Sequence, residues 1–449
     1  MTQFTSLSLI EPLTRALNEE GYTTPTPIQQ QSIPHLLAGR DLLGFAQTGT
    51  GKTAAFSLPI LQRMAEAPKK RQSKMIRALI LAPTRELAAQ IADSFKNYGR
   101  YLPFSCMAIY GGIGRGAQIK AMERGMDILV ATPGRFLDLA SEGHIQLANL
   151  DFFVLDEADQ MFDMGFIHDL RKIIKMIPAK RQTLLFSATM PTDIANIAQA
   201  ILTNPEKVEV TPVATTAEKI DQRVIYVEQP NKNALLGQVM QDPTITRALV
   251  FSRTKHGANK ITQKLMALNV SAEAIHGNKS QTARQKALDG FKSGAVRVLV
   301  ATDIAARGID VDNVSHVINF DLPNVPESYI HRIGRTARAN TTGISISFCS
   351  TSEKPFLRDI EKLIRKTLPS EVSDVVGTDA DRLAAIDDAK REMMRNSGGR
   401  GRGPNQGGRG SNSSSQPNRA RPNAGPNANR SPAGRNDRGR SPGGASKSR

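Results

Sequence analysis

The sequence contains no tryptophan, and aromatic residues make up only 5% of its 449 residues. Recognition of single-stranded nucleic acid by base stacking relies on aromatic side chains, so the composition argues against that kind of binding. Cysteine is scarce too. Cys106 and Cys349 lie far apart in apolar surroundings, and we interpret both as small core residues rather than as a disulfide or a reactive thiol. This use of cysteine is typical of a reducing compartment.

The chain also lacks a long hydrophobic run. No stretch reaches the roughly 18 consecutive apolar residues that suggest a membrane span, and the first residues, MTQFTSLSLIEPLTRAL, have no basic segment ahead of an apolar one. We therefore expect neither a membrane-spanning helix nor a secretory signal, and we predict a cytoplasmic protein.

The sequence also lacks the residue spacing that is typical of zinc ligands. No histidine stands at zinc-ligand spacing from a cysteine, so the sequence predicts no metal site built from these residue types. The histidines concerned are His35, His144, His168, His256 and His316.

Positive charge, by contrast, is in excess, with a formal net charge of +17. Residues 396–449 hold ten Arg and one Lys against Asp437 alone, so this segment carries +10 of that charge. It consists mainly of Gly, Ser, Asn, Pro and Arg, which bury too little surface to fold, so we predict a disordered tail. Excess positive charge favours a polyanion, most often nucleic acid. The alternative is a solvated tail that only improves solubility.

Short apolar runs alternate with amphipathic stretches along two successive parts of the chain. That alternation is typical of βαβ units, and the length exceeds what one core accommodates. We predict an α/β fold with two domains built on parallel sheets. The predicted strands are 41–46, 78–83, 104–111, 127–133, 152–157 and 183–189, then 224–229, 248–252, 271–277, 297–303, 316–321 and 344–350.

The segment AQTGTGKT, residues 46–53, follows a predicted strand and begins an amphipathic helix. Its glycines allow the backbone N–H groups to face phosphate oxygens at the helix N-terminus. Lys52 is placed to contact the β- and γ-phosphates, and the Thr53 hydroxyl to bind Mg²⁺. A chance glycine-rich turn is the weaker alternative. The predicted ATP-binding residues here are Ala46, which stands where the usual pattern has Gly, and Gln47, Thr48, Gly49, Thr50, Gly51, Lys52 and Thr53.

Two acids, Asp156 and Glu157, stand at the carboxyl end of another predicted strand, 152–157. Ligands bind at the carboxyl ends of strands in open α/β sheets. One carboxylate suits Mg²⁺, and its neighbour can orient and deprotonate a water molecule. We assign Asp156 to the metal and Glu157 to the base. Acids at strand ends more often cap helices. The catalytic interpretation is favoured here because the segment 46–53, called the phosphate loop below, lies upstream.

Three arginines, Arg332, Arg335 and Arg338, are spaced three apart in HRIGRTAR. In a helix this spacing places them on one face. Such a face is most often simply solvated. A guanidinium group brought across a domain cleft can instead stabilise a transferring phosphoryl group.

Over about residues 4–366, these segments and their order resemble the DEAD-box RNA helicases, which are superfamily 2 ATPases, and most of all the bacterial RhlE type. The letters DEAD stand at 156–159, GYTTPTPIQ at 21–29, PTREL at 83–87, SAT at 187–189 and ATDIAARGIDV at 301–311. The resemblance implies two tandem RecA-like domains, ATP and Mg²⁺ as cofactors, and single-stranded or short duplex RNA as partner.

The resemblance also implies roles for single residues. Gln29 is expected to contact the adenine edge, Phe4 to stack on the base and Asp310 to lie near the ribose. Arg335 and Arg338 are expected at the γ-phosphate. Ala337 between them stands where the family commonly has Gly, and the effect of its methyl group is left open. The residues expected to couple hydrolysis to strand separation or to link the two domains are Ser187, Thr189, Asp159 and His331.

RNA contacts are expected at strand ends in both domains, where hydroxyl, backbone N–H and guanidinium donors suit phosphates and sugars. The residues that the resemblance implies are Thr84, Arg85, Gly112, Thr132, Pro133, Gly134, Arg135, Arg253, Gly277, Gln281, Arg284 and Thr302.

The motifs and the changes in composition divide the chain into five parts. We predict an N-terminal RecA-like ATP-binding domain (1–209), a linker (210–222), a C-terminal RecA-like domain (223–368), a helical extension (369–395) and an Arg/Gly-rich RNA-binding tail (396–449).

The predicted function is that of an ATP-dependent RNA helicase that grips the RNA backbone without sequence specificity and separates short duplexes by ATP-driven domain closure. One alternative is an ATP-gated RNA clamp or chaperone with little unwinding. Another is a DNA translocase with the same ATPase. A GTPase or small-molecule kinase is disfavoured, because the sequence has no Asn-Lys-x-Asp guanine-binding motif. Ribosomal or degradosome components are the protein partners considered.

Overall fold

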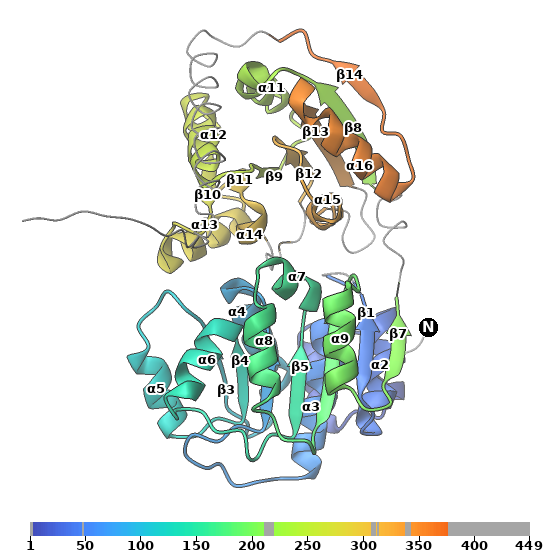
Figure 1. Ribbon diagram of the computed structural model, residues 1–449, viewed down its shortest axis with the longest axis vertical. Helices are drawn as coiled ribbons and strands as arrows, with labels where there is room; N and C mark the ends of the chain where they lie inside the picture. Colours follow the sequence, from blue (N-terminus) through green and yellow to red (C-terminus); the bar gives the residue numbers. More distant parts are fainter. Residues whose placement is uncertain are drawn as a thin grey trace, which may run out of the picture. The chain divides into compact units, whose positions relative to one another are not determined.

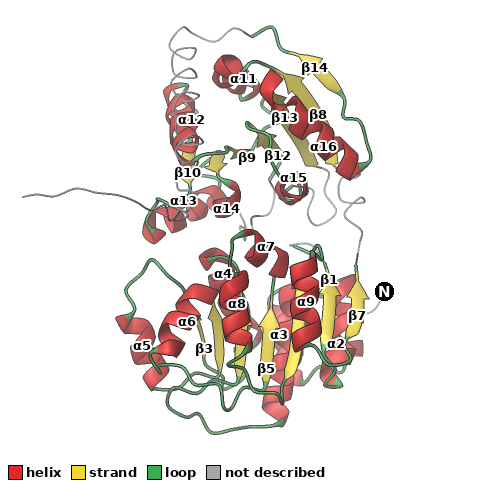
Figure 2. Cartoon of the chain, viewed as in Figure 1, coloured by secondary structure: helices red, strands yellow, loops and turns green. Residues whose placement is uncertain are grey.

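The computed structural model describes residues 3–46, 49–210, 220–306, 311, 314–336 and 343–375. The described residues up to 210 form one lobe and those from 220 form a second. Each lobe is built on a seven-stranded sheet with helices on both faces (Figure 1, Figure 2). The predicted fold class of two tandem parallel α/β domains is confirmed. None of the helices among the described residues has the length and apolar character that crossing a bilayer requires.

The first lobe contains only parallel strand pairs, as predicted from its uninterrupted apolar runs. In β2, for example, Leu81 lies opposite Leu155 on one side and Ala131 on the other. In sheet order the strands are β3 (Cys106–Ile109), β4 (Ile128–Ala131), β2 (Ala78–Leu81), β5 (Phe152–Leu155), β6 (Gln182–Ser187), β1 (Leu42–Phe45) and β7 (Glu206–Glu209).

Helices cover both faces of this sheet, because successive strand residues point to opposite sides. Ile80 and Val154 pack in one core cluster, and their neighbours Leu79 and Phe153 pack in the other. The first cluster includes residues of η1 (Phe4–Leu7), α1 (Glu11–Glu19), α2 (Pro27–Leu37), α3 (Lys52–Glu66) and α4 (Arg85–Tyr98). The second includes residues of α5 (Gly116–Glu123), α6 (Pro133–Ser141), α7 (Ala158–Asp163), α8 (Ile167–Ile174) and α9 (Thr192–Ile201).

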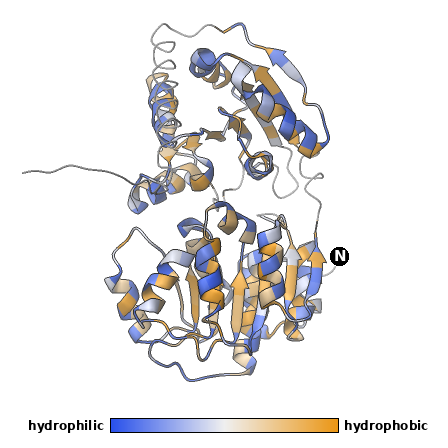
Figure 3. Ribbon diagram, viewed as in Figure 1, coloured by the Kyte–Doolittle hydropathy of each residue, from blue (hydrophilic) through white to orange (hydrophobic). Residues whose placement is uncertain are grey.

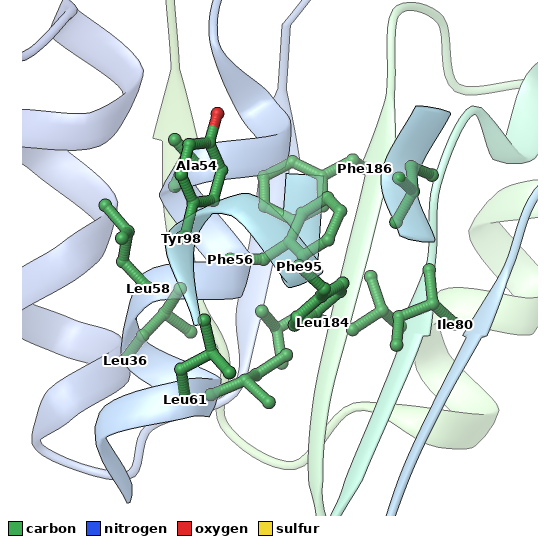
Figure 4. Close-up of a cluster of buried hydrophobic side chains, with 14 of the residues drawn as sticks. Leu36, Ala54, Phe56, Leu58, Leu61, Ile80, Phe95, Tyr98, Leu184 and Phe186 are labelled. Atoms are coloured by element: carbon green, nitrogen blue, oxygen red, sulfur yellow. The ribbon is translucent and has the colours of Figure 1, made fainter. Parts of the chain in front are cut away.

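Burial of both sheet faces accounts for the apolar strands seen in Figure 3. Three aromatic rings anchor the first cluster (Figure 4). The ring centroid of Phe56 lies 5.6 Å from that of Phe186 and 6.1 Å from that of Phe95. They fix α3 and α4 against the sheet, and α3 is the helix that carries the phosphate loop at its start.

The second lobe is also parallel throughout. In sheet order its strands are β10 (Ala272–Ile275), β11 (Val298–Ala301), β9 (Ala248–Phe251), β12 (His316–Asn319), β13 (Gly343–Cys349), β8 (Ile220–Tyr226) and β14 (Ser370–Val372). Its helical segments are η2 (Gln229–Asn231), α11 (Lys232–Val239), α12 (Lys255–Ala267), α13 (Gln281–Ser293), α14 (Asp303–Ala306), α15 (Pro326–Ile333), η3 (Thr351–Glu353) and α16 (Lys354–Ile364).

The two sheets share one strand order. Counted from the start of each lobe, the strands follow third, fourth, second, fifth, sixth, first and seventh in both. Local details repeat as well. Thr84 caps the helix after the second strand of the first lobe, accepting a hydrogen bond from Leu87 N, and Thr254 does the same for Gly257 N in the second. Each strand of one sheet therefore has a counterpart in the other.

The two edge strands β7 and β14 were not predicted. No strand was predicted between 190 and 223, and 210–222 was predicted to be a linker, yet Glu206–Glu209 pairs with β1 and β8 begins already at Ile220. Ser370–Val372, within the predicted helical extension, is a strand. Both are short edge strands with much polar, exposed surface, so they lack the apolar run that identifies a central strand. Residues 211–219 and all residues after 375 lie outside the described ones.

Candidate active site

The phosphate loop joins β1 to α3 in the first lobe. Gly51, the residue before the helix, has φ +93°, a conformation that glycine adopts without strain. A Cβ atom there would lie 2.5 Å from Gln29 Nε2 and 2.9 Å from Thr26 Oγ1. The loop therefore requires glycine for its backbone angle and for space. Gln47 and Thr48, two of the predicted loop residues, lie outside the described residues.

Lys52 and Asp156 face each other beside this loop. Lys52 Nζ donates a hydrogen bond to Ala46 O at 3.1 Å and lies 3.7 Å from Asp156 Oδ1. Lys52 is 5% exposed and Asp156 is 1% exposed. The pKa of Asp156 is raised to about 6, chiefly by burial; the positive charge of Lys52 opposes the rise, and the negative charge of Glu157 adds to it. Two segments that are far apart in the sequence thus form one buried charge pair.

The oxygen atoms of Asp156 and Thr53 fit a hydrated Mg²⁺ ion. Asp156 Oδ1 is buried and accepts no hydrogen bond from any described residue. A buried carboxylate oxygen beside a phosphate loop is the kind of ligand that a hard divalent cation prefers. Thr53 follows Lys52 in the first turn of α3, where its hydroxyl can be the second protein ligand.

Glu157 has an unusual backbone conformation for a glutamate. Its φ of 55° and ψ of 52° lie in the left-handed region, and its side chain is 2% exposed. Non-glycine residues held in this region store strain that tends to occur at functional sites. The conformation ends β5 and starts α7 one residue later. Asp156, before this turn, lies beside Lys52, whereas Asp159, after it, contacts Thr189.

The two residues predicted to contact adenine occupy protected positions. Gln29 belongs to the capping box of α2: its Oε1 accepts from Thr26 N at 2.9 Å, and its Nε2 donates to Gly51 O at 3.1 Å. Gln29 thus links the start of α2 to the last glycine of the phosphate loop. Phe4 is 5% exposed and packs in the core cluster with Leu7 and Ile28. Its stacking on a base stays a prediction.

A hydrogen-bond network links α7 to the end of β6. Asp159 Oδ2 accepts from Thr189 N at 3.0 Å and from Thr189 Oγ1 at 3.1 Å. Ser187 Oγ accepts from Asp159 N at 3.2 Å and donates to Thr189 O at 2.7 Å. Three of the four predicted coupling residues are therefore in direct contact, immediately beyond the acid pair. The fourth, His331, belongs to the second lobe.

The residues predicted to bind RNA in the first lobe gather at the carboxyl ends of β2, β3 and β4. Thr84 and Thr132 precede the first residues of α4 and α6. Gly112 has φ +81°, and a Cβ there would lie 2.2 Å from Arg85 Nη1. Arg135 donates weakly to Ile113 O at 3.4 and 3.5 Å. The predicted phosphate-loop residues follow β1, the predicted acid pair follows β5 and the predicted coupling residues lie at the end of β6, so the predicted sets divide one sheet edge between them.

The corresponding residues of the second lobe follow β9, β10 and β11. Arg253 is partly exposed, and its Nη2 donates to Glu353 Oε1 at 3.0 Å. Gly277 is exposed, Thr302 is partly exposed, and Gln281 opens α13. Arg284, in the first turn of α13, is 7% exposed.

The arginine segment does not form one helical face. The helix α15 ends at Ile333, so Arg335 lies beyond it. Arg332 points into the lobe, where it pairs with Asp303 at 2.5 and 2.7 Å. Arg335 is 4% exposed, its Nε donates to His331 O at 3.2 Å, and both residues line a small hollow. The prediction that the arginines share one face assumed a helix that continues through all of them, and α15 ends too early for that. Arg338, Ala337 and Asp310 lie outside the described residues.

One charged cluster in the second lobe, made of Lys232, Asp321, Glu353 and Arg253, was not predicted from the sequence, in which Arg253 alone was singled out, as an RNA contact. Its members follow four different strands, and no predicted motif includes Lys232, Asp321 or Glu353. Only the repeated strand order relates them to the phosphate-loop site.

Comparison with known proteins agrees with this geometry. Residues 26–197 match the model of the DEAD/DEAH box helicase family, and residues 231–340 match that of the helicase conserved C-terminal domain. The DEAD-box ATP-dependent RNA helicase CshA of Bacillus licheniformis is 43% identical over 365 residues, which cover 81% of this chain and 74% of that protein. The ATP-dependent RNA helicase CshA of Listeria monocytogenes is 41% identical over 368 residues, which cover 82% and 70%.

Solved structures agree as well. That of S. cerevisiae Dbp5 bound to RNA and ADP BeF3 has a TM-score of 0.74 and 29% identity, and covers 88% of this chain and 99% of its own. That of the DEAD-box helicase Mss116 bound to ssRNA and UDP-BeF has a TM-score of 0.77 and 27% identity, with 88% of both chains covered. These likenesses extend over both lobes and are those of the RecA-like folds expected from the sequence. The RhlE subtype stays a prediction.

Proposed function

The chain belongs to the DEAD/DEAH box helicase family, and from this premise we propose that it is an ATP-dependent RNA helicase, which hydrolyses ATP to ADP and phosphate and uses the cycle to separate short RNA duplexes. The observation that carries the proposal is that the phosphate-loop site and the predicted RNA-binding residues lie at the same edge of the first sheet. The buried pair Lys52–Asp156 stands at 3.7 Å in one part of this edge, and the predicted RNA residues stand in the other.

The nucleotide half of the edge supplies charge and fixed geometry. Backbone N–H groups of the loop around Gly49 and Gly51 hold phosphate oxygens, and Lys52 brings the positive charge. Thr53 and Asp156 would hold Mg²⁺, which when bound neutralises phosphate charge. Glu157 orients the attacking water and accepts its proton. Gln29 contacts adenine, and its hydrogen bond to Gly51 O ties that contact to the loop.

The RNA half of the edge offers donors to phosphates and sugars rather than to bases. Thr84 and Thr132 stand at helix N-termini, where backbone N–H groups are available to anions. Arg85 beside Gly112 adds a guanidinium group. Contacts of this kind position RNA without reading its sequence. The second lobe adds contacts of the same kind through Arg253, Gly277, Gln281, Arg284 and Thr302.

Coupling between the two halves runs through the Asp159–Ser187–Thr189 network, which starts two residues after Glu157. A change at the phosphates that moves α7 must also move the end of β6. Arg335 and Arg338 stabilise charge on the transferring phosphoryl group, and His331 links the second lobe to this movement. The work required is small, because base-pair stacking is worth about 1.4 kcal/mol per step.

The experiment that tests the proposal measures ATP turnover and displacement of a short RNA duplex on the same protein. We expect RNA to stimulate ATPase activity and ATP to drive displacement. Turnover without displacement would favour the ATP-gated clamp. Equal stimulation by DNA of the same length would favour a translocase that does not select RNA.

For the cellular setting we propose the cytoplasm and assemblies that carry RNA, such as ribosomal or degradosome components. The support is the +10 charge of residues 396–449, which suits a polyanionic surface. Crosslinking in cells followed by sequencing of the bound RNA tests this assignment, and recovery of unrelated RNA alone would count against it.

A further inference from the structure

Four charged side chains meet in the second lobe: Lys232, Asp321 and Glu353 are buried, and Arg253 is partly exposed. Lys232, the first residue of α11, is fully buried. Its Nζ donates to Phe320 O at 2.7 Å and to Glu353 Oε2 at 2.6 Å, and lies 3.5 Å from Asp321 Oδ1. Arg253 contacts the same glutamate from the exposed side. The cluster holds two cations and two anions, so its formal charge is zero.

This cluster has the same place in its sheet as the phosphate-loop site has in the first lobe. Lys52 opens the helix after the first strand of its lobe, and Lys232 opens the α-helix after the first strand of the second. Asp156 and Asp321 both follow the fifth strand. The Lys–Asp distances are 3.7 Å and 3.5 Å. Each lysine also donates to a backbone carbonyl, Ala46 O in one lobe and Phe320 O in the other.

The two sites differ in what faces the lysine. In the second lobe Glu353 comes from the segment after the sixth strand and accepts five hydrogen bonds. Oε2 accepts from Lys232 Nζ, from Ser350 N at 3.0 Å and from Ser350 Oγ at 2.8 Å. Oε1 accepts from Leu322 N at 3.1 Å and from Arg253 Nη2 at 3.0 Å. A lysine, an arginine and two backbone N–H groups are the donors that proteins use to bind phosphate.

We propose that Glu353 is a built-in anion, whose carboxylate fills a latent phosphate-binding site in the second lobe and thereby keeps that site closed to nucleotides. The comparison with a nucleotide phosphate beside Lys52 rests on the proposed function, whereas the five hydrogen bonds to Glu353 do not. Removal of the carboxylate leaves Lys232 and Arg253 with an unfilled position between them. The ligand class that fits the position is a tetrahedral oxyanion, either inorganic phosphate or a phosphate monoester.

Thermal unfolding of the full chain tests this proposal. All proteins carry Lys52→Ala, so that phosphate binding by the loop of the first lobe is weakened equally. Glu353→Ala is compared with this background and with Asp359→Ala, which removes an exposed carboxylate from α16. The midpoint temperature of unfolding is measured for each protein in sodium phosphate and in sodium chloride at equal ionic strength.

We expect Glu353→Ala to unfold at a lower temperature in chloride and to gain about 3 °C or more in phosphate beyond the gain of the background. Asp359→Ala should behave like the background. An equal phosphate response in Glu353→Ala and the background would overturn the proposal. A Glu353→Ala chain that folds only in phosphate would support it.

Glu353→Gln provides the second variant, because it keeps the shape of the side chain but removes its charge. The amide still fills the position, so we expect a lower midpoint that phosphate does not restore. A Glu353→Gln protein that unfolds at the background temperature would refute the need for an anion, whatever the outcome for Glu353→Ala. Neither measurement depends on helicase activity, so failure here and failure of the proposed function are distinguishable.

Discussion

A single buried carboxylate, Asp156, places opposite demands on folding and on chemistry. In the folded protein its pKa is raised to about 6 from a usual 3.8, chiefly by burial, with Lys52 opposing and Glu157 adding to the rise. The folded state therefore binds this proton more tightly than the unfolded chain does. The stabilisation that results is fully present below pH 3.8 and is lost as the pH rises through about 6. At neutral pH the ionised side chain costs stability.

Asp156→Asn removes that cost. In metal-free and nucleotide-free protein at pH 8, we expect the free energy of unfolding to rise by on the order of 2 kcal/mol, while ATPase activity is lost. Denaturant unfolding of both proteins in chelator, at pH 5 and pH 8, measures the difference. It should be smaller at pH 5. A variant that is less stable than the parent at pH 8 would contradict the assigned cause of the raised pKa.

At the level of secondary-structure elements, the parallel sheet brings the ends of strands together, although these segments are far apart in the sequence. In the first lobe α7 and β6 are tied by the hydrogen bonds of Asp159 with Thr189 and Ser187. These contacts fix the relation between two elements rather than the chemistry at either one. Their loss should separate ATP turnover from the work done on RNA.

Thr189→Val removes one hydroxyl of this network and keeps the side-chain shape. We expect ATPase activity to stay near that of the parent and duplex displacement per ATP to fall about tenfold, the effect of losing 1–2 kcal/mol of coupling. Parallel ATPase and displacement assays measure the ratio, with the exposed Ser141→Ala as control. Equal loss of both activities would place Thr189 in the chemistry instead.

A second prediction concerns the turn between β3 and α5. Gly112→Ala adds a methyl group that would lie 2.2 Å from Arg85 Nη1 at a residue with φ +81°, so the turn and the guanidinium must shift. We expect the RNA concentration for half-maximal ATPase stimulation to rise several-fold, with basal ATPase activity unchanged.

The matched control is Gly114→Ala, because a Cβ at Gly114 meets no atom within 4 Å among the described residues. It should respond to RNA like the parent. Identical RNA dependence of the Gly112 and Gly114 variants would remove Arg85 and Gly112 from the RNA-binding edge.

The central strands and the loop between β1 and α3 could be predicted because their signals are local. Apolar runs identify strands buried on both faces, and the loop that contains Lys52 has a distinctive pattern. The edge strands β7 and β14 have no such run. The contact of Gln29 with Gly51 and that of Glu353 with Lys232 join segments 22 and 121 residues apart. Tertiary folding alone creates these contacts, and neither segment shows them by itself.

For the whole molecule, the excess positive charge is concentrated in residues 396–449. Deletion of this segment should weaken RNA binding and flatten its dependence on salt, because each lost contact with a single-stranded phosphate lowers the slope by about 0.7. Basal ATPase activity should not change. RNA titrations at several salt concentrations measure the slope. A slope equal to that of the full chain would show that the segment does not contact RNA.

The central claim is that ATP hydrolysis in the first lobe drives separation of RNA strands. Displacement of a short RNA duplex, followed together with phosphate release, tests it most directly in the parent and in Glu157→Gln. We predict that RNA stimulates phosphate release and that ATP drives repeated displacement in the parent. Glu157→Gln should still bind ATP but lose multiple turnover in both assays. Repeated displacement by Glu157→Gln at the parent rate, or phosphate release by the parent without any displacement, would contradict the account.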